Sequence, residues 1–177
     1  IYSASTVDQM PHMVANLALF GHSGLWSVPD IDRTETMIIL GGNPMASNGS
    51  VWTVPDFRNR AKALQKRGGQ LVVIDPRRTE TAKIADRHLF IRPATDGLLL
   101  VALLKAVLTH PERPALPDYI DNLDAVAEAV SGFDSGACAA QCGVALPDIE
   151  WLADRMVTGP AALYGRIGAA TQSFGTL

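Results

Sequence analysis

Short apolar segments, each followed by a polar turn, divide this chain. In residues 70–74, Leu, Val, Val and Ile follow one another between a Gly-Gly pair and Asp75-Pro76. A continuous apolar run of this length is typical of a strand that is covered on both faces. Similar patterns predict three further strands, at residues 36–40, 88–92 and 161–164.

Helical periodicity separates the predicted strands. Between residue 55 or 56 and residue 67, Phe57, Ala61 and Leu64 recur at i, i+4 and i+7, which predicts an amphipathic helix ended by Gly68-Gly69. The opposite face is basic, and a solvated helix face explains it more simply than an anion site. Further helices are predicted at 11–20 (ending at Gly21), 79–85, 96–109 (capped by Thr95, apolar nearly all round and so in the core), within 119–142, and from 146 to a stop at Gly159-Pro160.

This alternation predicts an α/β fold, three-layer α-β-α, with a mainly parallel, Rossmann-like sheet and right-handed crossovers. We expect one domain over residues 1–177. It comprises a lead-in (1–35), a core (36–110), a helical part (111–160) and a returning strand and turn (161–177). Parallel strands would bring the turns at 41–44, 75–79, 93–96 and 165–168 to one edge of the sheet, where open α/β sheets bind ligands.

The turn after residues 70–74 carries the most distinctive chemistry. Asp75 can accept two hydrogen bonds from the edge of a base, and Arg77 or Arg78 can hold phosphate. In the alternative interpretation, Asp75 forms a salt bridge with one of these arginines and Thr79 caps the next helix. Four polar turns at one edge favour a nucleotide-like ligand. The G-x-G-x-x-G and P-loop motifs are absent, so an ordinary NAD or ATP site is not supported.

Composition narrows the class of protein further. With 15 basic and 18 acidic residues the net charge is −3, so nothing in the charge favours a nucleic-acid partner. The spacing of Cys138 and Cys142 lacks the paired C-x-x-C of metal sites, and we expect both to be buried in a helix. The longest apolar run, 98–104, is shorter than the ~20 residues of a membrane span. No signal peptide is visible and the sequence starts without Met, so we expect a cytoplasmic fragment of a longer protein; an upstream export signal would make it periplasmic.

Three blocks in order carry a family resemblance: Leu-Gly-Gly-Asn-Pro ending at Pro44, Val-Ile-Asp-Pro-Arg-Arg-Thr-Glu-Thr-Ala ending at Ala82, and Ile-Arg-Pro-Ala-Thr-Asp ending at Asp96. Together they resemble the molybdopterin oxidoreductase family, which includes formate dehydrogenases, periplasmic nitrate reductases and dimethyl-sulfoxide reductase. The resemblance covers roughly the whole chain. It implies the catalytic subunit of a molybdenum-dependent oxidoreductase that holds bis(molybdopterin guanine dinucleotide) at its strand tips for two-electron redox chemistry at Mo.

The resemblance also implies roles for individual residues. Asp75 would read the guanine edge, because a carboxylate can accept from guanine N1–H and N2–H together, and backbone amides at the glycine turns would suit the pyrophosphate. The implied cofactor-binding residues are Gly41, Gly42, Asn43, Pro44, Ser47, Ile74, Asp75, Pro76, Arg77, Arg78, Pro93, Thr95, Asp96, Arg166, Gly168 and Gln172.

The metal ligand is implied by position. In the family, a Cys, selenocysteine, Ser or Asp side chain binds molybdenum about one helix upstream of the first nucleotide strand. Asp8 lies in the matching region and is the candidate catalytic and metal-binding residue, with Ser3 and Ser5 as weaker candidates. The alternative is that Asp8 caps the following helix. Gln9 stands where formate dehydrogenases carry a His, which argues against formate as the substrate.

The resemblance implies partners as well: the pterin dinucleotide, a small-molecule redox substrate, electron-transfer subunits and the rest of its own chain, with an iron–sulfur cluster in an N-terminal region of the parent protein. We expect the fragment alone to be inactive. Two other hypotheses are a cofactor-free structural subunit of a respiratory complex with the same fold, and the central domain of a thiamine-diphosphate enzyme. The Gly-Gly-Asn-Pro and Pro-Ala-Thr-Asp turns fit the last poorly.

Overall fold

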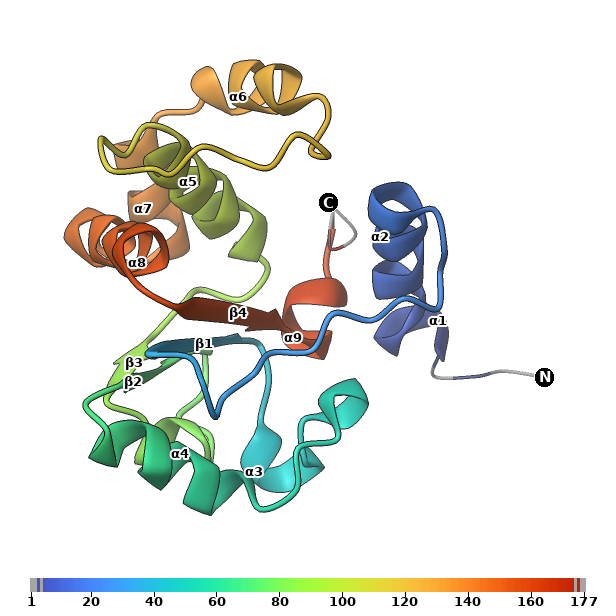
Figure 1. Ribbon diagram of the computed structural model, residues 1–177, viewed down its shortest axis with the longest axis vertical. Helices are drawn as coiled ribbons and strands as arrows, with labels where there is room; N and C mark the ends of the chain where they lie inside the picture. Colours follow the sequence, from blue (N-terminus) through green and yellow to red (C-terminus); the bar gives the residue numbers. More distant parts are fainter. Residues whose placement is uncertain (1–2, 4, 174, 176–177) are drawn as a thin grey trace.

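The computed structural model describes residues 3, 5–173 and 175, which form a parallel sheet with helices on both faces (Figure 1). The strand order is β3-β2-β1-β4, and β1 pairs in parallel with both β2 and β4. The predicted α/β fold with a parallel sheet is therefore confirmed. The strands are β1 (Thr36–Leu40), β2 (Gln70–Ile74), β3 (Arg87–Leu89) and β4 (Ala161–Gly165).

The two central strands, β1 and β2, are the most deeply buried. All five residues of β1 and the last four of β2 are buried, because helices cover both faces of the sheet. This explains why both appear in the sequence as continuous apolar runs rather than as alternating patterns. The predicted bounds of both strands are confirmed.

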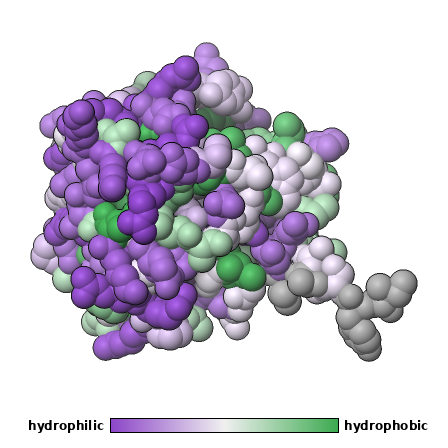
Figure 2. Space-filling view, turned by 90° about the horizontal axis from the view of Figure 1, so that it is seen from below, coloured by the Kyte–Doolittle hydropathy of each residue, from purple (hydrophilic) through white to green (hydrophobic). Residues whose placement is uncertain are grey.

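On one face of the sheet lie α3 (Pro44–Ser47), the 3₁₀ helices η1 (Ser50–Trp52) and η2 (Ala82–Ile84), and α4 (Phe57–Lys66). Phe57, Ala61 and Leu64 are buried as predicted and pack with Ile39 and Val73 of the sheet. Figure 2 shows the molecule from below the view of Figure 1, and the surface seen there is mainly hydrophilic. The basic face of α4 is thus a solvated helix face.

The other face is covered by α5 (Asp96–Leu108), α7 (Ser135–Cys142) and α8 (Leu146–Thr158), while α6 (Leu123–Ser131) packs on the outside of α5 (Figure 1). Leu99 of α5 and Leu152 of α8 are completely buried in the same cluster as Ile38 of β1. Cys138 and Cys142 are free and buried in this core, as predicted.

The lead-in (1–35) contains α1 (Ser5–Asp8) and α2 (Met10–Phe20), which lie beside α9 (Ile167–Ala170), past the end of the sheet (Figure 1). Gly21 ends α2 in the left-handed conformation (φ 70°) and its N–H donates to Leu17 O, as the sequence predicted. No residue of α2 is buried. Its residues are half-buried or exposed, so apolar burial holds this helix less firmly than it holds the helices that cover the sheet.

The structure corrects several predicted elements. The third strand covers Arg87–Leu89 rather than 88–92, because it pairs with β2 over three residues before Ile91 turns into the core. The predicted helix at 79–85 is the single 3₁₀ turn η2, and the predicted helical region 119–142 is divided into α6 and α7. Thr95 precedes α5, but its hydroxyl donates to Arg92 O (2.7 Å) instead of capping the helix.

The part of the chain that the structure describes contains no helix long and apolar enough to cross a membrane.

Candidate functional site

Main-chain hydrogen bonds tie three strand tips together at the carboxyl edge of the sheet. Gly41 N–H, after β1, donates to Ile74 O at the end of β2 (3.0 Å). Arg166 N–H, after β4, donates to Leu40 O (2.9 Å), and Gly168 N–H donates to Gly41 O (3.0 Å). The predicted turns therefore meet at one edge, because the strands are parallel.

The contact between Gly41 and Gly168 is closer than side chains would allow. Gly41 has a φ of +61°, and a Cβ on it would lie 2.6 Å from Ala169 N and 2.8 Å from Gly168 Cα. A Cβ on Gly168 would lie 2.8 Å from Gly41 Cα. Both positions require glycine for this approach of two backbones.

The turn after β1 is fixed by the side chain of Asn43. Its Oδ1 accepts from the hydroxyl (2.7 Å) and the N–H (3.2 Å) of Thr81, and its Nδ2 donates to Glu80 Oε2 (2.8 Å). The hydrogen bond from Asn43 is the main reason that the pKa of Glu80 is lowered. Pro44 is buried as the first residue of α3, and Ser47 is exposed and donates to Asn43 O (3.2 Å). The Asn43 amide thus fixes the shape of the loop, and one of its two N–H donors is engaged by Glu80.

The turn after β2 presents Asp75 and two exposed arginines. Asp75 Oδ1 accepts from Arg77 N–H (2.8 Å), and no hydrogen bond to Oδ2 occurs within the described residues. Neither Arg77 nor Arg78 forms an ion pair with Asp75 in this part of the chain, so the alternative salt bridge is wrong. Thr79 Oγ1 accepts from Ala82 N–H, the first residue of η2 (3.1 Å), but the residue at the N-cap position of η2 is Thr81, so the prediction that Thr79 caps the next helix is wrong.

The third and fourth turns meet through Asp96 and Gln172. Gln172 Nε2 donates to Asp96 Oδ2 (2.7 Å) and to Ala169 O (2.9 Å). Asp96 is only 6% exposed, and this burial, with a smaller contribution from the Asp75 carboxylate, raises the pKa of Asp96. Pro93 is exposed and Thr95 half-buried in the turn before α5.

Asp8 meets Arg166 at the fourth turn. Arg166 Nη2 donates to Asp8 Oδ1, and Nη1 donates to Asp8 O (3.3 Å). Asp8 is the last residue of α1 and Gln9 precedes α2, so the prediction that Asp8 caps α2 is wrong. Ser3 and Ser5, the weaker candidates, are exposed and hydrogen-bonded to each other (3.1 Å). No group of three or more metal-ligating side chains occurs among residues 3, 5–173 and 175.

Two predicted cofactor-binding residues have their side chains elsewhere. Ile74 is completely buried in the core, so its side chain cannot reach a ligand. Arg166 is 3% exposed and faces Asp8 rather than the open edge. The remaining predicted residues belong to the segments that follow the four strands, and among them Pro44 and Asp96 are also buried.

The sequence did not identify the residues whose hydrogen bonds hold the turns of this edge in place. Thr81 fixes Asn43, as described above. His12 of α2 places Nε2 3.2 Å from Gly165 O and stacks on Trp26, with ring centroids 5.8 Å apart. The Trp in a loop otherwise rich in small and polar residues was a usable signal, whereas nothing in the sequence links His12 to residue 165.

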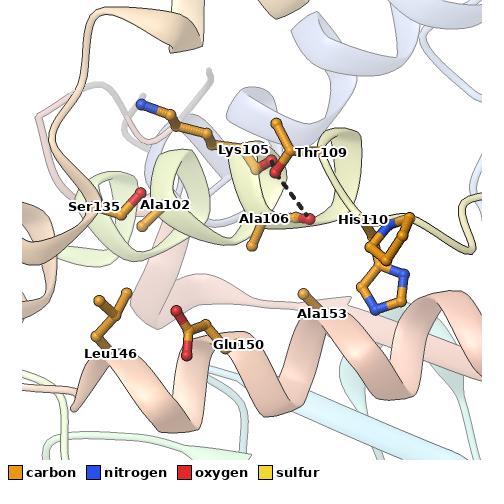
Figure 3. A pocket seen from close by; sticks show the side chains of 10 residues that line it. Ala102, Lys105, Ala106, Thr109, His110, Ser135, Leu146, Glu150 and Ala153 are labelled. Atoms are coloured by element: carbon orange, nitrogen blue, oxygen red, sulfur yellow. Dashed lines mark hydrogen bonds between the residues drawn. The ribbon is translucent and has the colours of Figure 1, made fainter.

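A separate hollow of about 300 Å³ lies between α5 and α8 in the helical layer (Figure 3). Small residues such as Ala102 and Ala153 line it, together with His110, Ser135 and Glu150. None of the predicted site residues lines this hollow, and Lys105 at its rim already donates to Ser131 O (2.9 Å). The candidate site is the edge of the sheet rather than this hollow.

Fold and edge together define an α/β protein of the doubly wound type, with polar, glycine-containing turns at the carboxyl ends of parallel strands. No protein-family model matches the chain. It is similar to dimethyl sulfoxide/trimethylamine N-oxide reductase of Cereibacter sphaeroides (27% identity over 165 residues, 87% of this chain and 20% of the relative). It is also similar to nitrate reductase of Klebsiella oxytoca (29% identity over 169 residues, 90% of this chain and 18% of the relative).

Among solved structures, acetylene hydratase from Pelobacter acetylenicus has the same fold. Its TM-score to this chain is 0.78 at 22% sequence identity, over 95% of this chain and 22% of that one. The chain thus spans about a fifth of the length of the relatives it matches. These matches confirm the resemblance to the molybdopterin oxidoreductase family that the three sequence blocks predicted.

Proposed function

We propose that this chain is the part of a molybdenum-dependent oxidoreductase that binds a molybdopterin guanine dinucleotide along the carboxyl edge of its sheet. The observation that carries the proposal is the Asp75 turn, where a half-buried carboxylate stands beside two exposed arginines without pairing with either. Similarity to oxidoreductases over most of the chain supports the same class of function.

In this proposal, Asp75 recognises guanine. Its Oδ2 is available, and Oδ1 has a further lone pair beside the hydrogen bond from Arg77 N–H. Guanine presents two neighbouring donors, N1–H and N2–H, that match these two oxygens, whereas adenine does not. The guanidinium groups of Arg77 and Arg78 would hold phosphate oxygens.

The turn from Gly41 to Asn43 would receive the pyrophosphate. Its backbone is fixed from behind by Gly168 and Thr81, so its shape does not depend on a ligand. Main-chain N–H groups of the turn would donate to the phosphate oxygens. Asp96, Thr95 and the preceding proline would close the nucleoside end.

Asp8, the candidate ligand of the proposed metal, can offer one of its two carboxylate oxygens. Asp8 Oδ1 is engaged by Arg166, while no hydrogen bond to Oδ2 is formed within the described residues, so one oxygen of Asp8 remains to ligate a metal. The side chain of Asp8 is 31% exposed, which leaves that oxygen accessible. When bound, the molybdenum cofactor supplies two-electron redox chemistry that protein side chains do not provide.

The same proposal extends to the parent protein. It includes a small-molecule redox substrate, electron-transfer subunits and an iron–sulfur cluster in the parent protein, the cytoplasm as its compartment, and inactivity of this chain by itself.

Calorimetric titration with guanosine diphosphate and adenosine diphosphate tests the proposal. We expect guanosine diphosphate to bind and Asp75→Asn to weaken it by about 10- to 100-fold, the effect of a lost hydrogen bond to a charged group. Glu150→Gln, in the helical layer, is the matched control and should bind like the parent chain. Equal affinity for both nucleotides, or no heat from either, contradicts the proposal. The latter result would favour the cofactor-free structural subunit.

A further inference from the structure

We propose that Arg166 is a positioning residue that holds Asp8, and with it the α1–α2 lead-in, against the strand tips. The inference rests on the proposed function in treating Asp8 as the candidate metal ligand. Its structural part, the attachment of the lead-in through one buried guanidinium, stands on contacts of this chain alone.

The backbone of Arg166 is fixed before its side chain begins. Its N–H donates to Leu40 O of the central strand (2.9 Å), directly after β4 ends. Its side chain then passes under the first turn, where a Cβ on Gly42 would come within 3.2 Å of Arg166 Cβ. The guanidinium therefore reaches α1 from a rigid base in the sheet, with 4% of the side chain exposed.

The fork of the guanidinium binds Asp8 at two separate atoms. Nη2 donates to the carboxylate Oδ1 and Nη1 to the main-chain carbonyl (3.3 Å). The first contact holds the carboxylate of Asp8 in position, and the second holds the main chain at the end of α1. A lysine ammonium, which is a point charge on a flexible stem, does not reproduce this geometry.

The guanidinium in turn depends on Asp8, because Arg166 is the more deeply buried partner of the pair. Arg166 Nε is buried and makes no hydrogen bond in the described part of the chain. Within the described residues, the carboxylate that forms an ion pair with Arg166 is that of Asp8. Removing one partner of such a pair leaves a desolvated charge behind, which costs far more than breaking a surface ion pair.

Other contacts hold the lead-in only weakly. No residue of α2 is buried, and the second polar contact, from His12 Nε2 to Gly165 O (3.2 Å), ends on the residue before Arg166. Both polar attachments thus converge on the tip of β4. Loss of the stronger one should release residues 5–20 while the sheet stays folded.

This arrangement has a consequence for Asp8. Arg166 occupies one oxygen of the carboxylate, so the direction of the other oxygen is set by the sheet rather than by the short helix α1. Arg166 then contributes to the site through Asp8, and not by touching the cofactor as the sequence resemblance implied.

Amide hydrogen exchange of the protein without added cofactor tests the inference. In Arg166→Gln, we expect exchange at residues 5–20 to rise by about 10- to 100-fold, while the amides of β1 and β2 stay protected. Arg166→Lys should recover part of this protection, because it retains the charge. Arg87→Gln is the control, since it breaks the half-buried ion pair with Asp148 (2.9 Å) away from the lead-in; it should leave residues 5–20 unchanged.

Unchanged exchange at 5–20 in Arg166→Gln overturns the inference, as does an equal rise in the sheet, which would indicate a general structural role. If Arg166→Gln does not fold, Asp8→Asn, which leaves the buried arginine in place, decides by the same measurement. The readout needs no nucleotide. Failed binding of guanosine diphosphate with the expected exchange pattern would therefore refute the proposed function and leave the attachment standing.

Discussion

Gly41→Ala should destabilise the protein strongly, although it adds a single methyl group. The new Cβ would lie 2.6 Å from Ala169 N, 2.8 Å from Gly168 Cα and 2.9 Å from Gly168 C. All three atoms belong to the backbone of the turn after β4, so no side-chain rotation relieves the contacts. Either the tips of β1 and β4 separate or the Gly41 turn changes its conformation.

The expected change in the free energy of unfolding combines two destabilising contributions and one stabilising contribution. A non-glycine residue at a φ of +61° costs about 1–2 kcal/mol, and overpacking against a fixed neighbour costs about 1–3 kcal/mol. Replacing glycine also restricts the unfolded chain, which returns about 0.4–1 kcal/mol. We expect the free energy of unfolding to fall by roughly 2–4 kcal/mol.

Urea denaturation followed by circular dichroism measures this loss. With a slope of about 2 kcal/mol per molar, the midpoint should move down by roughly 1–2 M. The matched control is Gly165→Ala, at the end of β4, where an added Cβ meets nothing within 4 Å. That variant should unfold within about 1 kcal/mol of the parent chain. Equal stability of the two variants would refute the reasoning, because the contact between the tips would then not be tight.

Three further predictions concern the core, the edge and the thiols. Leu64→Ala should lower the free energy of unfolding by about 2–5 kcal/mol, because Leu64 is completely buried, whereas Leu19→Ala, at a side chain 74% exposed, should change it by less than about 0.5 kcal/mol in the same assay. The pKa of Asp96 is raised mainly by burial, so the native state holds that proton more tightly than the unfolded state; the stability this contributes is present at low pH and lost as the pH rises through the raised pKa. Asp96→Asn, which still accepts from Gln172, should flatten that part of the stability–pH curve, and an unchanged curve would contradict the assignment. Both cysteines of α7 are buried, so a thiol reagent should modify them only after denaturant unfolds the chain, and rapid labelling of the native protein would contradict their placement.

The central strands and the amphipathic helix α4 could be predicted closely, because each is set by local pattern. Residues 36–40 and 70–74 are apolar runs with turn residues at both ends, and the spacing of Phe57, Ala61 and Leu64 fits a single helix face. The third strand was less predictable because its length depends on how far it follows β2. That is a property of the sheet and not of residues 88–92.

The candidate edge could be predicted as a set of turns, but the side-chain contacts that hold these turns could not. Parallel order alone brings the turns together, so the sequence sufficed for that. The pairing of Asp8 with Arg166 joins opposite ends of the chain, and neither residue has a local signal for it. The same holds for the hydrogen bonds that Asn43 forms with Thr81 and Glu80.

The sheet is assembled from strands that are far apart in the chain, and this determines how it can form. Thr36 of β1 aligns with Gln70 on one side and with Ala161 on the other. The first pairing closes a short loop, while the second must wait for the whole helical layer from α5 to α8 to be made and folded back. On a ribosome, one flank of β1 would therefore stay open until the last strand emerges.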